Sequence, residues 1–165
     1  MTPTSESFFC PGEHKRPKLE IEIRKCGIEE WKLFSKFHYL NNSLHRAAQC
    51  YVGFINDNPV CFAGILHFPH PNVRNFKQVS RVVVLPDYQG LGIGHKFITK
   101  IGQAYKDSGN RFILTSSAKG ILTAMIKSND WIVTRKGQVA KGNGSFKDST
   151  SYKKITCSFE YIGRK

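Results

Sequence analysis

Apolar and polar residues follow two different periods along this chain, and the periods divide it into strand-like and helix-like segments. An alternation of two predicts half-buried strands, and a spacing of three to four predicts helices with one apolar face. The predicted strands are 19–23, 50–55, 60–68, 78–85, 111–115, 131–135 and 152–161, and the predicted helices are 28–40, 93–104 and 119–127. The turn residues Asn56, Asp57, Asn58 and Pro59 join two of these strands, which predicts an antiparallel hairpin.

The order of these segments predicts an α/β (α+β) fold. Strand–helix–strand units follow an antiparallel meander, so we expect a mixed, mostly antiparallel sheet of about seven strands with helices on both faces. With 165 residues, 40% of them apolar, the chain is long enough for one domain with a core. Residues 1–18 are rich in Pro, Ser and Thr and predict a flexible tail, and 19–165 predict a single domain.

Several classes of protein are disfavoured by the composition. No apolar run reaches the roughly 18 residues that a membrane span needs, and the first 18 residues lack the apolar region of a secretory signal. The five cysteines are scattered, which fits neither a disulfide framework nor a zinc knuckle. His67 and His70 form an HxxH pair near Cys61 but would need a third ligand, so no metal site is predicted. We expect a cytoplasmic protein.

Positive charge is concentrated in the later part of the chain. The net charge is +13, of which residues 1–60 contribute +1 and residues 61–165 contribute +12. The positive charge of residues 61–165 favours an anionic partner, which could be a phosphorylated cofactor, a nucleic acid or an anionic surface.

The most informative segment is a glycine-rich turn after the strand 78–85. Glycines at 90, 92 and 94 let successive backbone N–H groups converge, and the helix that starts there adds a partial positive charge, so the turn predicts a phosphate site. His95 occupies the position where a Walker loop or a dinucleotide fingerprint requires glycine. The remaining pattern is Gln-x-x-Gly-x-Gly, formed by Gln89, Gly92 and Gly94.

This pattern, together with the element order over 19–161, resembles the GNAT acyltransferase superfamily, whose motif holds the pyrophosphate of coenzyme A. The resemblance implies acetyl-CoA as cofactor and an amine as acceptor. It implies that the strand before the motif parts from its neighbour and that a backbone N–H near Val83 or Val84 polarises the acyl carbonyl. The implied cofactor-binding residues are Val83, Val84, Gln89, Gly90, Leu91, Gly92, Ile93 and Gly94.

The usual acid and base of these enzymes are missing from their usual places. No Asp or Glu lies between Asp57 and Asp87, and no Tyr lies between Tyr105 and Tyr152. As substitutes we consider a His that titrates near neutrality and a Tyr hydroxyl at the end of the first helix, an Arg before the glycine motif and a Ser that ends the next strand. The candidate catalytic residues are therefore His38, Tyr39, Arg81 and Ser116. The alternatives that remain open are a solvated His38, a packed Tyr39, an exposed strand arginine at 81 and a helix-capping Ser116.

Three functions remain open. The first is a coenzyme A-dependent N-acyltransferase that acts on a small amine or a protein amine. His38-Tyr39-Leu40, Arg81 and Ser116-Ser117 together resemble the phage Mom branch of the superfamily, which implies modification of adenine in DNA. The basic residues within 135–154, with Phe146 and Tyr152 for stacking, are consistent with that second function. The third is a binding module that keeps the fold without catalysis.

Overall fold

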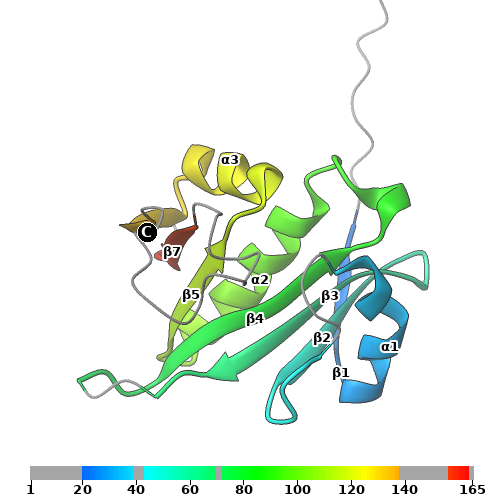
Figure 1. The fold of residues 1–165 in the computed structure, drawn as a ribbon, viewed down its shortest axis with the longest axis horizontal. Coiled ribbons are helices and arrows are strands. Elements are labelled where there is room, and N and C mark those ends of the chain that lie inside the picture. The colour runs from blue at the N-terminus through cyan, green and yellow to red at the C-terminus, as the bar shows by residue number, and fades with distance from the viewer. Residues whose placement is uncertain (1–19, 39–42, 70–71, 138–155, 164–165) are drawn as a thin grey trace, which may run out of the picture.

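The structure, a computed structural model, describes residues 20–38, 43–69, 72–137 and 156–163. The strands are β1 (Glu22–Cys26), β2 (Gln49–Ile55), β3 (Asn58–His67), β4 (Phe76–Val84), β5 (Arg111–Ser116), β6 (Trp131–Lys136) and β7 (Cys157–Tyr161). The helices are α1 (Trp31–Phe34), α2 (Ile93–Asp107) and α3 (Lys119–Lys127), with short 3-10 turns η1 (Ile28–Glu30), η2 (Ser35–Phe37) and η3 (Pro86–Tyr88). Figure 1 shows their arrangement.

All seven strands form one sheet in the order β1-β2-β3-β4-β5-β7-β6. Only the pair β4–β5 is parallel, and the other neighbours are antiparallel, including the β2–β3 hairpin. The predicted mixed, mostly antiparallel sheet of about seven strands is therefore confirmed.

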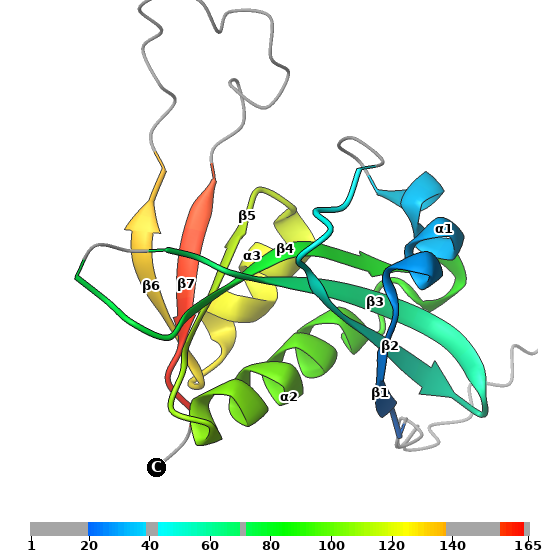
Figure 2. The same cartoon turned by 90° about the horizontal axis from the view of Figure 1, so that it is seen from below.

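Helices cover both faces of the sheet, as predicted. On one face, α2 and α3 pack on the larger core, which includes Phe97, Phe112, Met125 and Phe159. On the other face, α1 places Trp31 and Phe34 in a smaller core with Phe62 and Val83. Figure 2 shows α1 and α2 on opposite sides of the strands. We refer to these two sides as the α2 face and the α1 face.

The prediction of one continuous helix over 28–40 is wrong. The segment folds as two 3-10 turns around the single turn of α1, and the backbone is extended at His38. Aromatic residues have modest helix propensity, and only Trp31 and Phe34 are buried here, whereas Leu33 and Phe37 remain exposed. The two buried side chains, three residues apart, stabilise one helical turn against the sheet. No further burial stabilises additional turns in the described part of this segment.

Several predicted strand boundaries also differ, most of them by one to three residues. The first strand begins at Glu22 and continues to Cys26, three residues later than the predicted end, because its pairing with β2 extends to Cys26↔Cys50. Of the predicted strand 152–161, the residues 152–155 lie outside the described part of the chain, and β7 covers Cys157–Tyr161. Within the described ranges, no helix is both long and apolar enough to cross a membrane.

Candidate functional site

The parallel strands β4 and β5 pair over only part of their length. Four residue pairs join them, from Phe76↔Arg111 to Val79↔Leu114, although β4 continues to Val84 and β5 to Ser116. Beyond Val79 and Leu114 the two strands run apart (Figure 1). We call this opening the splay, and we call the end at Val79–Leu114 its closed end.

A β-bulge in β4 accounts for the divergence. Opposite β3, Val79 pairs with Ile65 and Arg81 pairs with Gly64, so Ser80 is an additional residue in β4. A bulge bends the strand that carries it and increases its local twist. β4 therefore keeps its pairing with β3 up to Val84 while it turns away from β5.

The backbone of β4 presents polar groups to the splay. In an antiparallel pair, successive residues direct their N–H and C=O groups alternately toward and away from the partner. Leu85 N donates to Val60 O of β3 at 2.9 Å, so Val83 also faces β3, and Val84 faces the splay. Of the two predicted residues, Val84 is thus the one whose N–H points to the opening. The N–H of Val82 points the same way. Three identical residues in a row could not show from the sequence which of their N–H groups face the splay.

The predicted glycine turn lies at the open end of the splay. Gly90 and Gly92 have φ values of 81° and 76°, the left-handed conformation that side chains disfavour, and Gly92 is the N-cap of α2. No side chain of the described residues caps this helix, so its first N–H groups are directed outward without a side-chain acceptor from that part of the chain. A Cβ on Gly92 would meet no atom within 4 Å, so the space above the turn is open.

The remaining residues of the turn have distinct positions. Gln89 Nε2 donates to Val84 O at 2.9 Å and so holds the turn against the end of β4. Leu91 is 55% exposed, whereas the side chain of Ile93 is buried in the core and can contribute only its backbone. A Cβ on Gly94 would lie 3.1 Å from Val84 Cγ2, so glycine lets α2 begin close to the strand.

Two of the four predicted catalytic residues lie on the α1 face. The His38 ring lies 5.8 Å from the Trp31 ring in an edge-on contact. Arg81, opposite Gly64 of β3, follows the same side of β4 as Val83, and its Nη1 donates to Ser80 O at 2.8 Å. Tyr39 lies outside the described residues.

Ser116 is not brought together with this pair. It alternates along β5 with the same side as Phe112 and Leu114, which belong to the core of the α2 face. Its side chain is buried, and its Oγ accepts a hydrogen bond from Ala118 N at 3.1 Å, which stabilises the turn into α3. The structure therefore places it behind the sheet, on the side away from His38.

A neighbouring hydroxyl takes the front position. Thr115 lies directly after the last β4–β5 pair, is exposed, and has its Oγ1 2.9 Å from Ser158 Oγ of β7. Thr134 on β6 donates to the backbone oxygen of Ser158 at 3.2 Å. Sequence reasoning missed this hydroxyl pair, because its members are 43 residues apart and no short motif links them.

The carboxylate on this side of β7 has a partner. Glu160 accepts two hydrogen bonds from Arg111, at 2.7 and 2.6 Å, and this pairing raises the pKa of Arg111 above its usual value. The thiols of Cys61 and Cys26 are poor nucleophiles, since burial raises the pKa of Cys61 to about 12 and that of Cys26 likewise to about 12. Among the described residues, no group of three or more His, Cys, Asp or Glu side chains is placed to hold a metal ion.

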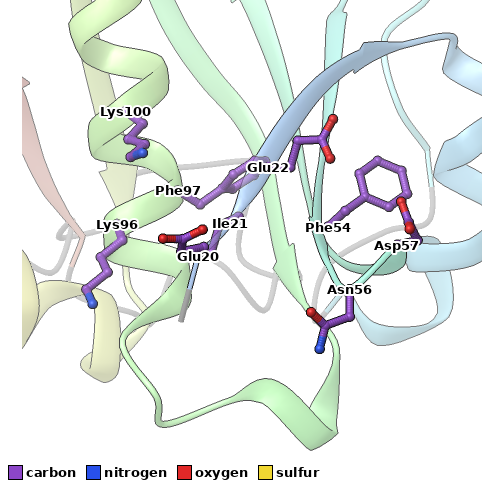
Figure 3. A pocket seen from close by; sticks show the side chains of 9 residues that line it. All are labelled: Glu20, Ile21, Glu22, Phe54, Asn56, Asp57, Lys96, Phe97 and Lys100. Atoms are coloured by element: carbon purple, nitrogen blue, oxygen red, sulfur yellow. The ribbon is translucent and has the colours of Figure 1, made fainter. Parts of the chain in front are cut away.

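A cavity of about 730 Å³ lies elsewhere, between the first half of α2, the strand β1 and the β2–β3 turn. Figure 3 shows lysines 96 and 100 on α2, Glu20 on the side of these lysines, and Glu22, Phe54 and Asp57 toward the β2–β3 turn. The Glu22 and Asp57 carboxylates accept hydrogen bonds from Arg24. None of the predicted site residues lines this cavity, so it is separate from the splay.

Solved acetyltransferases share this fold. The structure is similar to an IAA acetyltransferase from Bacillus cereus (TM-score 0.63, 13% identity, 86% of this chain and 99% of that one). It is also similar to the ribosomal-protein-S18-alanine N-acetyltransferase of Escherichia coli (TM-score 0.64, 11% identity, 88% and 96%). A Bacillus subtilis acetyltransferase solved with CoA matches at TM-score 0.62 and 12% identity over 88% and 99%.

The sequence identifies the family more directly than these distant structures do. The acetyltransferase (GNAT) family model matches residues 16–120, which include α1, the splay strand β4, the glycine turn and α2. The chain therefore belongs to the acetyltransferase (GNAT) family. No curated protein matches it in sequence.

Proposed function

We propose that the chain is a coenzyme A-dependent N-acetyltransferase, which binds acetyl-CoA along the splay and transfers its acetyl group to an amine. The observation that carries the proposal is the splay itself: β4 leaves β5 after Val79–Leu114, and beyond Val84 the chain passes through the glycine turn to the N-terminus of α2, which carries no side-chain cap from the described residues. An acyl donor with a phosphorylated end and a long neutral arm matches an anion site joined to an open strand edge.

The residues of the turn fit the pyrophosphate of such a donor. The open space above Gly92 and the outward N–H groups of α2 provide hydrogen-bond donors without a competing side chain. Acetyl-CoA supplies an acyl group activated as a thioester. The chain positions that thioester: the N–H of Val84 is available to the arm of the donor, and the N–H of Val82, nearer the closed end, donates to the carbonyl oxygen, which favours attack by the amine.

The α1 face is the side from which the acceptor approaches. His38 stands there beside Trp31 and accepts a proton from the incoming ammonium in its neutral form, and Tyr39, its neighbour in sequence, remains a proposed proton donor. Arg81 supplies a positive charge on the same face for an anionic part of the acceptor.

The amine of a nucleobase in DNA is the second candidate acceptor. It is favoured by the charge on the acceptor side: Arg135 is exposed near the end of β6 and pairs with Ser158, the neighbour of Thr115, and the exposed Lys136 follows it at the end of the strand. Glu160 is neutralised by Arg111, so this side has little negative charge to attract a polyamine. A non-catalytic binding module is disfavoured, since backbone pairing does not close the splay.

The test of the cofactor assignment is a calorimetric titration of CoA into the wild type and Gly92→Asp. Aspartate tolerates the left-handed conformation better than most residues, so the variant is expected to fold, while its carboxylate would repel the pyrophosphate. We expect binding by the wild type and at least tenfold weaker binding by the variant, a loss of about 1.4 kcal/mol. Equal affinities would show that the turn is not the site.

A further inference from the structure

The closed end of the splay is lined by hydroxyl groups. Thr115 follows Leu114, the last residue of β5 that pairs with β4, and Ser158 lies opposite it on β7. Their Oγ atoms are 2.9 Å apart, and either of them can be the donor. Thr115 is exposed on the α1 face, so a ligand in the splay can reach the pair from the side on which the acceptor arrives.

The reacting end of the donor reaches this position if the proposed function holds, and the inference rests on it. The turn at Gln89–Gly94 lies at the open end, and the arm of CoA extends from there along β4. From Val84 to Val79 the strand spans about 16 Å, at roughly 3.3 Å per residue. The pantetheine arm is a chain of comparable length, and with the acetyl carbonyl on the N–H of Val82 its sulfur lies just beyond Val82, toward the closed end and Thr115.

We propose that the Thr115–Ser158 hydroxyl pair relays a proton from the acceptor nitrogen to the sulfur of coenzyme A. As the new C–N bond forms and the C–S bond breaks, the sulfur keeps the bonding electron pair. A hydroxyl of the pair gives its proton to that sulfur and takes a proton from the nitrogen, directly or through its partner hydroxyl. The products are a neutral amide and free CoA thiol, and both hydroxyls are restored.

Hydroxyl groups are better suited to a proton relay than to acting as an independent acid. An alcohol is too weak an acid to protonate a thiolate by itself, but it can pass a proton on when it receives one in the same step. Because either hydroxyl can donate to the other, the pair carries a proton in either direction. This arrangement needs neither a tyrosine in the stretch between Tyr105 and Tyr152 nor a carboxylate on β4, the two groups that the sequence lacks.

The experiment measures the acidity of the CoA thiol in the complex, which requires no knowledge of the acceptor. CoA is titrated with base in complex with each protein, thiolate is followed by its ultraviolet absorbance, and the matching complex with desulfo-CoA is subtracted. The variants are Thr115→Val, which keeps the shape and removes the hydroxyl, and Thr115→Ser, which keeps the hydroxyl. Thr134→Val is the matched control, since it removes a β6 threonine hydroxyl that donates to the backbone oxygen of Ser158 rather than to its hydroxyl.

A hydroxyl that donates to the sulfur stabilises the thiolate. We therefore expect Thr115→Val to raise the pKa of the bound thiol by about one to two units, as the loss of a hydrogen bond to a charged group predicts. Thr115→Ser and Thr134→Val should keep the wild-type value, and Ser158→Ala should shift it in the same direction by less.

Two results would overturn the relay and can be told apart. If CoA binds and Thr115→Val leaves the thiol pKa unchanged, or if Thr134→Val shifts it equally, the hydroxyl pair does not reach the sulfur and only this inference fails. If CoA binds to none of the proteins, the wild type included, the proposed function fails and the relay fails with it. Should Thr115→Val not fold, Ser158→Ala answers the same question, and an unchanged thiol pKa in that variant also counts against the relay.

Discussion

Two glycines with nearly the same backbone conformation allow the anion site to be tested separately from stability. Gly92 has φ +76° and Gly109 has φ +75°, and an added Cβ would meet nothing within 4 Å at either position. The cost of an alanine therefore comes from the left-handed backbone alone, about 1–2 kcal/mol at each site. For a chain of this length, that cost lowers the melting temperature by about 2–8 °C.

The two positions differ in their place along α2. Gly92 caps its N-terminus, and Gly109 follows its C-terminus, about 22 Å away for a helix of 15 residues. Urea denaturation should give similar losses of unfolding free energy for Gly92→Ala and Gly109→Ala. Calorimetry should show that only Gly92→Ala weakens CoA binding, by about tenfold or more, since a methyl group displaces phosphate oxygens from N–H groups that bind a charged ligand.

The reasoning would be refuted by either of two results. Equal CoA affinities for the two variants would mean that the space above Gly92 is not used by the ligand. A much larger loss of stability at Gly92 than at Gly109 would mean that the turn is constrained by contacts that the structure does not show.

Three further predictions concern other parts of the molecule. If His38 accepts a proton and Tyr39 donates one during the reaction, steady-state kinetics should show turnover lowered by about 10² to 10⁴ fold in His38→Ala or Tyr39→Phe. Unchanged turnover in both variants would assign the two residues structural roles. If DNA is the acceptor, the logarithm of its affinity should fall linearly with the logarithm of the salt concentration, and Lys136→Gln should make that slope shallower by about 0.9. An affinity that does not depend on salt would leave a small amine as the acceptor. Lys141 and Lys147, outside the described residues, should add to that slope in the same way. The pKa of His95 is lowered, mainly by burial and to a lesser extent by the charge of Lys96, while the charge of Asp130 acts in the opposite direction. Its Nε2 is buried without a hydrogen-bond partner among the described residues. Below pH 6.5 the unfolded chain therefore binds a proton that folded His95 resists, so stability should fall as the pH drops, and urea denaturation of His95→Gln should show a smaller fall.

The sequence predicted the strands and the glycine turn because local signals determine them. Alternation in the 50–68 hairpin and the spacing of apolar residues in α2 each depend on neighbours a few positions away. The left-handed glycines were predictable for the same reason, since few residues other than glycine fit that conformation. The 28–40 helix failed because tertiary burial of Trp31 and Phe34 decided how far the turn continues.

The arrangement of the site depends on contacts that a linear pattern does not reveal. The bulge at Ser80 changes which side of the sheet Arg81 occupies, and it follows from the pairing register with β3. Ser116 was the natural candidate as the serine that ends β5, yet the alternation of the strand places it behind the sheet and Thr115 in front. The Gln89 side chain donates a hydrogen bond to the backbone oxygen of Val84 at the end of β4, so the glutamine of the motif has a structural role in holding the turn.

Backbone amide exchange with and without CoA is the most direct test of the central claim that the splay and the glycine turn form one cofactor site. CoA should slow exchange together at Val82 and Val84, whose N–H groups face the splay, and at Gly94 and His95 at the start of α2. The amide of Val83, which faces β3, should change little. Protection confined to Lys96, Lys100 and the residues around the separate cavity, with none in β4, would contradict the account.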